Sequence, residues 1–329
     1  MDGAQFDVVG VGNAIVDVLA KIDDDMLEGL GLKKGAMTLI DNNEAQRLYE
    51  NMPDTIEVSG GSAANTLTGI ASLGGKGSYI GKVRDDQLGK VFIRDLFDAG
   101  IQYPLRPTIN GPSTARCLIF VTPDAERTMQ TFLGASVLLG PEDIDPDTIG
   151  GAKITYLEGY LFDKEEAKKA FVKAAKLAHL SGRKVALTLS DSFCVERHRA
   201  SFKELIKGHI DIVFANSDEM LSLFETTSFE KAIASIRGSV DLAAITRGKD
   251  GSVIVTEDEI VEIRAEKIDK IVDTTGAGDL YAAGILYGVS AGYENQLVGR
   301  IGSICASEVI GHFGARPELS LDSLVKKQL

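Results

Sequence analysis

A short segment in the C-terminal part of the chain combines closely spaced glycines with a carboxylate. It reads D-T-T-G-A-G-D at residues 273–279, follows the apolar pair Ile271 and Val272, and precedes an apolar run that begins at Leu280. The pattern predicts a strand, a tight turn and the start of a helix. Backbone N–H groups in a first helical turn lack intrahelical partners, and the helix dipole makes that end positive. The segment therefore predicts an anion hole for a phosphate group.

The glycines and the last aspartate of this turn are the candidate catalytic residues. Gly276 and Gly278 let the backbone approach a bound group closely, and the N–H groups around Ala277 are expected to point outward. Asp279 then lies at the lip of the hole. Its carboxylate can accept the proton of an attacking hydroxyl while the hole holds a transferring phosphoryl group. The alternative is a helix cap on an ordinary glycine turn.

The turn resembles the C-terminal signature of the ribokinase-like carbohydrate and nucleoside kinases, the PfkB family. A second family signature, a glycine pair before a helix start, is matched in the N-terminal third by G-G-S-A-A-N at residues 60–65. The resemblance extends from Phe6 to the C-terminus. It implies a kinase that phosphorylates an alcohol, with Mg²⁺ as cofactor and ATP as co-substrate. Some relatives also bind a monovalent cation near the positions of Asp273 and Thr275.

The same resemblance implies an acceptor pocket in the N-terminal third of the chain. Its lining residues would be Asn13, Asp17, Gly61, Ser62 and Asn65. The two carboxylate oxygens of Asp17 can hold a vicinal diol, which suits a sugar or a ribose. An aspartate in a hinge of the lid is the alternative reading of Asp17.

Further motifs of the family imply nucleotide-binding positions. Asn216 and Glu219 match an N-x-x-E motif, and Thr246 and Gly248 match a nucleotide-binding turn. Glu219 would organise Mg²⁺ through water, because Mg²⁺ takes few direct protein ligands; the same Asn–Glu pair is also a helix-capping pattern. Arg127 could reach the γ-phosphate, since a guanidinium fork binds two oxygens, or could be an ordinary solvated arginine.

Alternating apolar runs and amphipathic stretches must position these motifs. The pattern predicts strands near residues 6–11, 78–80, 185–189, 210–214 and 242–245, and helices near 63–73 and 164–180. Such alternation favours an α/β fold with a mainly parallel sheet covered on both faces. It agrees with the three-layer α/β/α domain and small β lid that the resemblance implies.

Two segments break this alternation. Residues 14–41 and 106–127 are predicted to form short antiparallel strands without a helix between them. We expect them to build the discontinuous β lid. Residues 1–13, 42–105 and 128–329 would then form the large nucleotide-binding and catalytic domain.

Charge and cysteine content exclude several classes of protein. The 329-residue chain has a formal net charge of −13, which disfavours nucleic acid and anionic membranes as partners. Its three cysteines are widely separated, so a reducing compartment is expected. The polar, acidic start lacks the features of a signal peptide, and no apolar run is long enough to span a bilayer. We expect a cytoplasmic protein, as a monomer or as a homodimer paired through a lid edge.

The identity of the acceptor depends on more local features. Residues 127–136, 158–163 and 187–194 resemble bacterial adenosine-kinase-like members of the family, and S-D-S-F-C at 190–194 replaces the D-x-N-x-R of many sugar kinases. A base needs an apolar slot, for which Met37, Phe132, Tyr160 and Phe162 are candidates, although core packing also explains each. We expect phosphorylation of adenosine to AMP, a purine-salvage reaction. A ribose- or fructose-type sugar kinase is the alternative.

Two other classes of function remain as rivals. A non-catalytic nucleoside or sugar sensor would need no base, so the intact Asp279 argues against it. A nicotinamide-dependent dehydrogenase would need a G-x-G-x-x-G fingerprint, but the G-V-G at residues 10–12 is followed by Ile15 where the third glycine belongs.

Overall fold

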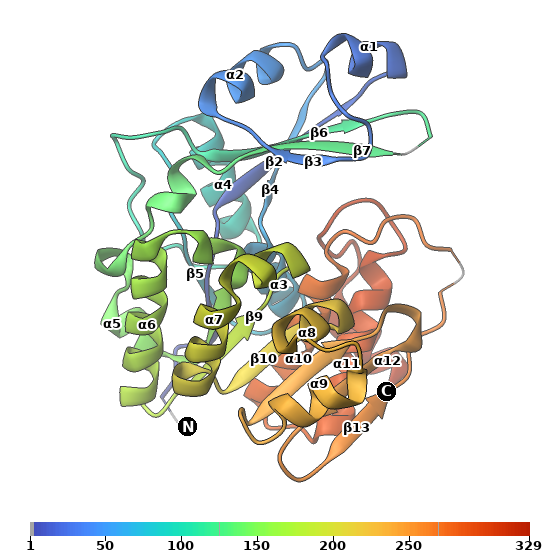
Figure 1. Ribbon diagram of the computed structural model, residues 1–329. Helices are drawn as coiled ribbons and strands as arrows, with labels where there is room; N and C mark the ends of the chain where they lie inside the picture. The colour runs from blue at the N-terminus through green and yellow to red at the C-terminus, as the bar shows by residue number, and fades with distance from the viewer. Residues whose placement is uncertain (1–2, 125, 269) are drawn as a thin grey trace.

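Parallel strands form the centre of the larger part of the molecule (Figure 1). The computed structural model describes residues 3–124, 126–268 and 270–329. In these residues the central sheet has eight strands in the order β13-β12-β11-β10-β9-β8-β1-β5. The β11–β12 and β12–β13 pairs are antiparallel and the other pairs are parallel. The strands are β1 (Phe6–Val11), β5 (Gly77–Ile80), β8 (Ala152–Glu158), β9 (Lys184–Thr188), β10 (Ile212–Asn216), β11 (Leu242–Thr246), β12 (Ser252–Val255) and β13 (Ile260–Ile263).

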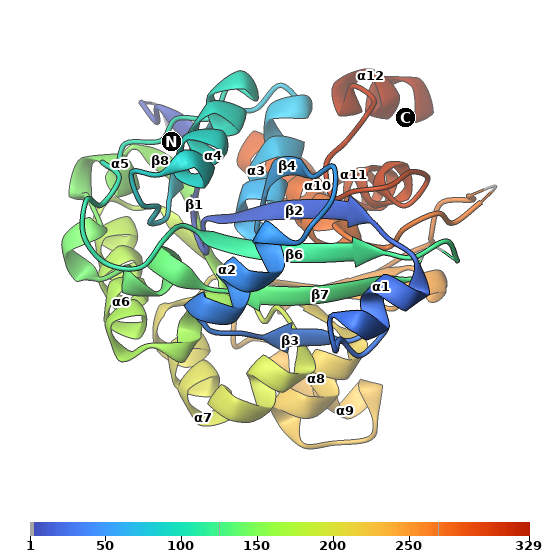
Figure 2. The same ribbon diagram turned by 90° about the horizontal axis from the view of Figure 1, so that it is seen from above.

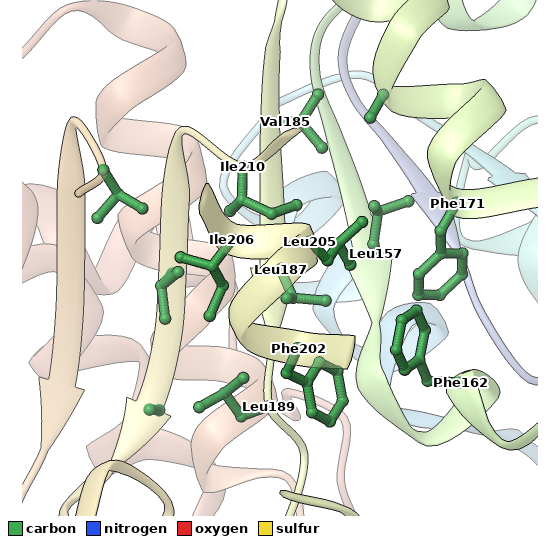
Figure 3. Packing of buried hydrophobic residues seen from close by; sticks show 14 of the residues in the cluster. Leu157, Phe162, Phe171, Val185, Leu187, Leu189, Phe202, Leu205, Ile206 and Ile210 are labelled. Atoms are coloured by element: carbon green, nitrogen blue, oxygen red, sulfur yellow. The ribbon is translucent and has the colours of Figure 1, made fainter. Parts of the chain in front are cut away.

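Helices cover both faces of this sheet. One layer contains α5 (Pro146–Gly150), α6 (Glu165–Leu180), α7 (Ser192–His209), α8 (Ser217–Phe224) and α9 (Phe229–Ile236); the other contains α3 (Ser62–Ser72), α4 (Gln87–Asp98), α10 (Ala277–Ala291), α11 (Asn295–Val309) and α12 (Leu321–Gln328). Both faces need a cover because successive residues of a strand point to opposite faces and both sets are apolar. In β9, Val185 and Leu187 pack against the α6–α7 layer, whereas Ala186 faces the α3–α10 layer. Figure 3 shows Phe171 of α6 and Phe202 of α7 in the first of these cores. The predicted three-layer fold is confirmed.

A second sheet of five strands lies over the carboxyl ends of the central parallel strands (Figures 1 and 2). Its order is β3-β7-β6-β2-β4, with β2 (Ile15–Lys21), β3 (Met37–Leu39), β4 (Ile56–Gly60), β6 (Ala115–Val121) and β7 (Arg127–Phe132). Two helices, α1 (Asp24–Gly29) and α2 (Asn42–Glu50), cover its outer face (Figure 2). Four 3-10 turns occur in the described residues: η1 (Gly134–Leu138), η2 (Pro141–Asp143), η3 (Gly159–Asp163) and η4 (Gly248–Asp250).

The lid exists as predicted, but its predicted boundaries are too narrow. Strand β4 pairs with β2, and β7 pairs with β6, so residues 56–60 and 128–132, which were predicted in the large domain, belong to the lid sheet. The predicted antiparallel strands are confirmed in part, since β2 runs antiparallel to β4 and β6 runs antiparallel to β7, but the predicted absence of parallel pairs and of a helix is wrong. Strands β2 and β6 run parallel, and α1 lies between β2 and β3. Every described helix is too short or too polar to cross a lipid bilayer.

Candidate active site

The predicted glycine turn forms the N-terminus of α10. Gly276 is the N-cap residue with φ of 79°, and a Cβ added there would lie 2.6 Å from the Cα of Ala315. Glycine is therefore required by both the backbone conformation and the close approach. The N–H groups of Gly278 and Asp279 follow in the first turn, where no intrahelical acceptor exists. The predicted strand at residues 271–272 is absent, because the Val272 N–H donates to the carbonyl of Ile310 in the loop after α11 instead of to a sheet.

Two residues of α3 hold the Asp279 carboxylate. The Ser62 hydroxyl donates to Oδ1 at 2.6 Å, and the Asn65 amide donates to Oδ2 at 3.0 Å. Burial raises the pKa of Asp279, while these two hydrogen bonds lower it. Helix α3 can start here because its N-cap residue is Gly61, which has φ of 89°. A Cβ added to Gly61 would lie 2.4 Å from the carbonyl oxygen of Asn13. The structure thus brings both predicted signatures together around one carboxylate.

Asp17 lies on β2 of the lid and faces the large domain. Its carboxylate lies against Gly60 of β4, where a Cβ would come within 2.5 Å of Oδ2. Burial raises the pKa of Asp17 from its ordinary 3.8 to about 6. The positive charges of Arg316 and Arg127 oppose this rise, whereas the charge of Asp279 adds to it. Asp17 is thus electrostatically coupled to the other carboxylate of the site.

The underside of the lid presents an apolar surface beside Asp17. Strand pairing places Asp17 next to Cys117 and Thr131, and Met129 next to Met37. Paired residues project from the same face of a sheet. Met37 is 55% exposed, so it stays a candidate for the predicted base slot.

The other predicted base-slot residues lie in different surroundings. Phe132 pairs with Arg116, which places it on the opposite face from Asp17, so the period of two in the strand overturns that candidate. Phe162 is buried and stacks on Phe202 with ring centroids 4.8 Å apart, so it is a core residue (Figure 3). Tyr160 is 40% exposed, and its hydroxyl donates to the carbonyl of Ser190 at the carboxyl end of β9.

A cavity of about 470 Å³ opens beside the glycine turn. Thr246 and Gly248, both predicted nucleotide-binding residues, line it together with Gly278 and Tyr281. The first turn of α10 therefore borders the same space as the turn after β11. This arrangement can hold a nucleotide with its phosphates directed at the N-terminus of α10.

Asn216 and Glu219 form a reciprocal capping box at the start of α8, next to this cavity. Asn216 pairs with Thr246, and its N–H and side-chain amide donate to Glu219 at 3.1 and 2.6 Å. Burial raises the pKa of Glu219 to about 7. The described residues contain no group of three His, Cys, Asp or Glu side chains that could hold a metal ion. A buried carboxylate already held by two donors fits an indirect contact with Mg²⁺ through water better than direct ligation.

Arg127 extends from β7 of the lid to the glycine turn. Its guanidinium forms an ion pair with Asp273 Oδ2 at 2.6 Å and donates to the Thr275 hydroxyl at 3.2 Å. Asp273 also accepts hydrogen bonds from the N–H groups of Thr275 and Gly314. These donors occupy both carboxylate oxygens, so the side chain does not fit a monovalent-cation ligand in this conformation. A cation at this place would need backbone carbonyls.

Glu158 is a buried residue of the site whose role the sequence did not predict, although it begins the segment 158–163. It ends β8, and its carboxylate accepts from the backbone and side chain of Asn13 at 3.2 and 2.9 Å and from the Ala63 N–H at 2.9 Å. Asn13 in turn accepts from the Ser136 hydroxyl at 2.9 Å. Glu158 thereby fixes the start of α3, which carries the ligands of the Asp279 carboxylate. The sequence offered one signal for this role, which is a single carboxylate at the end of an apolar strand.

Replacing Glu158 with glutamine should change how stability depends on pH. Burial raises the pKa of Glu158 from its ordinary 4.5 to about 7. Because the folded state holds the proton more tightly, this group's contribution to the free energy of unfolding falls as pH rises from about 4.5 to about 7, by on the order of 3 kcal/mol. We expect E158Q to be the less stable protein near pH 5, since an amide cannot accept all three hydrogen bonds, and to close the gap near pH 8.

Urea unfolding of both proteins across this range measures the effect. Glu196→Gln, which removes an exposed carboxylate from α7, is the matched control and should follow the wild type. A stability difference between E158Q and the wild type that is constant with pH would contradict the shifted pKa.

The chain matches one protein family over most of its length. The model of the pfkB family carbohydrate kinase matches residues 30–321. Among solved structures, adenosine kinase from Sinorhizobium meliloti is 48% identical, with coverage of 99% of this chain and 100% of that one and a TM-score of 0.91. A probable sugar kinase from Rhizobium etli CFN 42 is 46% identical, with 99% coverage of both chains and a TM-score of 0.91.

A curated relative at lower identity names a third acceptor. The 5-dehydro-2-deoxygluconokinase of Shouchella clausii (strain KSM-K16) is 26% identical over 99% of this chain and 98% of its own length. The relatives differ in acceptor but share phosphoryl transfer to an alcohol. The chain therefore belongs to the pfkB family of carbohydrate kinases and is a phosphotransferase with an alcohol acceptor.

Proposed function

We propose that this kinase transfers the γ-phosphoryl group of Mg-ATP to the 5′-hydroxyl of a nucleoside, with adenosine as the preferred acceptor. The observation that carries the proposal is the position of the Asp279 carboxylate. Ser62 and Asn65 hold it from the acceptor side, and the first turn of α10 presents N–H groups beside it. A general base and an anion hole in one turn are what in-line phosphoryl transfer requires.

The chemical step follows from this geometry. Asp279 accepts the proton of the acceptor hydroxyl, the hydroxyl oxygen bonds to the γ-phosphorus, and the bond from phosphorus to the ADP oxygen breaks. The N–H groups of Gly278 and Asp279 donate to the phosphoryl oxygens as their charge develops. Glu219 would hold Mg²⁺ through its water shell, and the bound ion supplies positive charge to the phosphates.

The lid supplies the other half of the acceptor site. Asp17 can accept from the two ribose hydroxyls, and Asn65 Oδ1, which is buried without a partner among the described residues, can accept from a further hydroxyl. Arg127 already reaches the glycine turn through its ion pair with Asp273, so its guanidinium would need only a local movement to bind a γ-phosphate oxygen instead. Closure of the lid over both substrates would exclude water as a competing acceptor.

The underside of the lid favours a nucleoside over a free sugar. Met37 and Leu39 of β3 are 55% and 52% exposed, and strand pairing puts both on the face that carries Asp17. A base can cover this apolar surface, whereas a sugar would leave it in water. The adenosine kinase named among the relatives supports the same acceptor, and the probable sugar kinase keeps a sugar as the second candidate.

An ADP-release assay with Mg-ATP tests the proposal. The acceptors are adenosine, inosine, guanosine, ribose, fructose and none. We expect the highest kcat/KM with adenosine, and a large loss for ribose because it lacks the base that contacts Met37. Met37→Ala should lower the preference for adenosine, whereas the control Leu180→Ala, which removes an exposed apolar side chain far from the lid, should not. Turnover confined to free sugars would overturn the acceptor, and tight nucleoside binding without turnover would indicate a sensor.

A further inference from the structure

The loop after α11 contacts the glycine turn at two consecutive residues. The Gly314 N–H donates to Asp273 Oδ2 at 3.0 Å. The backbone of Ala315 lies against Gly276, at the distance where a Cβ on Gly276 would be 2.6 Å from the Ala315 Cα. The loop is itself fixed from behind, because Glu308 accepts hydrogen bonds from the N–H groups of residues 318 and 319, each at 2.9 Å. It is therefore a rigid backing for the turn that carries Asp279.

The next residue of this loop reaches the lid. Arg316 donates through Nη2 to the hydroxyl of Ser59, a buried residue of β4. The Ser59 N–H in turn donates to Asp95 Oδ2 at 2.8 Å. Ser59 precedes Gly60, against which the Asp17 carboxylate lies. A single side chain thus joins the backing of the catalytic turn to the strand that supports the acceptor-binding aspartate.

The charges around Asp17 give this contact a second consequence. Asp17 and Asp279 converge on one site, where their charges repel. Arg127 is engaged in its 2.6 Å ion pair with Asp273. Arg316 has no such ion pair among the described residues, and its Nε is buried without a hydrogen-bond partner there. Its positive charge is therefore directed at the carboxylates of Asp17 and Asp95 through space, and it is the largest favourable charge that acts on Asp17.

We propose that Arg316 is a positioning residue of the acceptor site, which acts through Asp17 by holding β4 behind it and by presenting a positive charge to its carboxylate. The inference rests on the proposed function, because it assigns to Asp17 the binding of acceptor hydroxyls. An ionised carboxylate offers two acceptor oxygens to a diol, whereas a protonated one offers fewer and adds a donor. Arg316 does not touch the acceptor in this assignment.

The groups that face Asp17 decide the pH range of the effect. They are Arg316 from the loop, Arg127 from β7, Asp279 from α10 and Cys117 from β6. Burial raises the pKa of Cys117 to about 12, so its thiol stays neutral. Burial raises the pKa of Asp17 to about 6, and loss of Arg316 raises it further. Acceptor binding should then weaken as pH falls through neutrality.

Steady-state kinetics of Arg316→Gln from about pH 5.5 to about pH 8.5 test this assignment. We expect the KM for the acceptor to rise roughly threefold near pH 6.5, to rise by nearly tenfold near pH 5.5 and to change little near pH 8.5, because a rise of one unit from a pKa of about 6 lowers the ionised fraction tenfold only below both pKa values. The kcat at saturating acceptor should change less than about threefold. Arg316→Lys keeps the charge and should restore most of the lost affinity at low pH. Arg300→Gln, which removes an arginine that donates to the Gln328 carbonyl away from the site, is the matched control.

An NMR titration of Asp17 separates this inference from the proposed function. In protein labelled with ¹³C-aspartate, the Asp17 carboxyl signal is assigned with Asp17→Asn and followed against pH. Its midpoint should rise by about one unit in R316Q and stay near the wild-type value in R316K. An unchanged midpoint in R316Q overturns the inference, as does an equal loss of kcat and kcat/KM at every pH. A wild type that phosphorylates no acceptor overturns the proposed function but leaves the titration as a valid test of Arg316.

Discussion

Replacing Asp279 with asparagine is expected to lower kcat by roughly 100-fold or more, the contribution typical of a general base. The change should leave the fold intact, because the new amide can donate to the Ser62 hydroxyl while its oxygen still accepts from Asn65. Loss of the base removes an interaction made in the transition state, so kcat and kcat/KM should fall together. Affinity for ATP and for the acceptor should change little.

ADP-release kinetics and calorimetric titration of both substrates measure these effects. Burial raises the pKa of Asp279, so wild-type kcat should fall as the pH decreases and the base becomes protonated, at a higher pH than an ordinary aspartate would give. The residual activity of D279N should lack that limb. Asp98→Asn, which removes an exposed carboxylate at the end of α4, is the control and should match the wild type. Near-normal turnover in D279N would refute the assignment of the base.

The parts of the site that the sequence predicted are those whose geometry is local. The glycine turn at residues 273–279 and the glycine pair at 60–61 constrain the backbone within a few residues, so their letters predict a helix N-terminus. That the two helices meet at Asp279 depends on packing of α3 against α10, which follows from the parallel sheet. The sequence predicted that meeting only through the resemblance to a family.

The parts that it missed depend on distant pairs. Glu158 bonds to Asn13 across 145 positions and to Ala63 across 95, and no local pattern marks such partners. Arg316 is one arginine in an irregular loop, and only its contact with Ser59 reveals its place in the site. The lid boundaries failed for the same reason. Strand β4 lies at the edge of the lid sheet and has few buried residues, so its composition does not mark it as a strand. Only its pairing with β2 shows that it belongs to the lid.

The two glycines of the catalytic turn should respond differently to alanine. At Gly276 the φ of 79° strains any residue with a Cβ, and the Cβ would meet the backbone of Ala315. We expect Gly276→Ala to lower the free energy of unfolding by roughly 2–4 kcal/mol and the turnover by roughly 100-fold or more, because the displaced N–H groups no longer form the anion hole. At Gly278 a Cβ would meet open space, so Gly278→Ala should keep the stability of the wild type or gain up to about 1 kcal/mol.

Kinetic measurements then show which of the two glycines is needed for ATP binding but not for stability. Gly278 lines the cavity beside the turn, so its new methyl group would stand where the phosphates are expected, and G278A should raise the KM for ATP in a protein of normal stability. Urea unfolding and ADP-release kinetics of both variants give the comparison. A stable Gly276→Ala would show that the turn tolerates rearrangement. If the KM for ATP in G278A equals the wild-type value, the phosphates do not bind beside Gly278, because a side chain cannot share the space that a phosphate occupies.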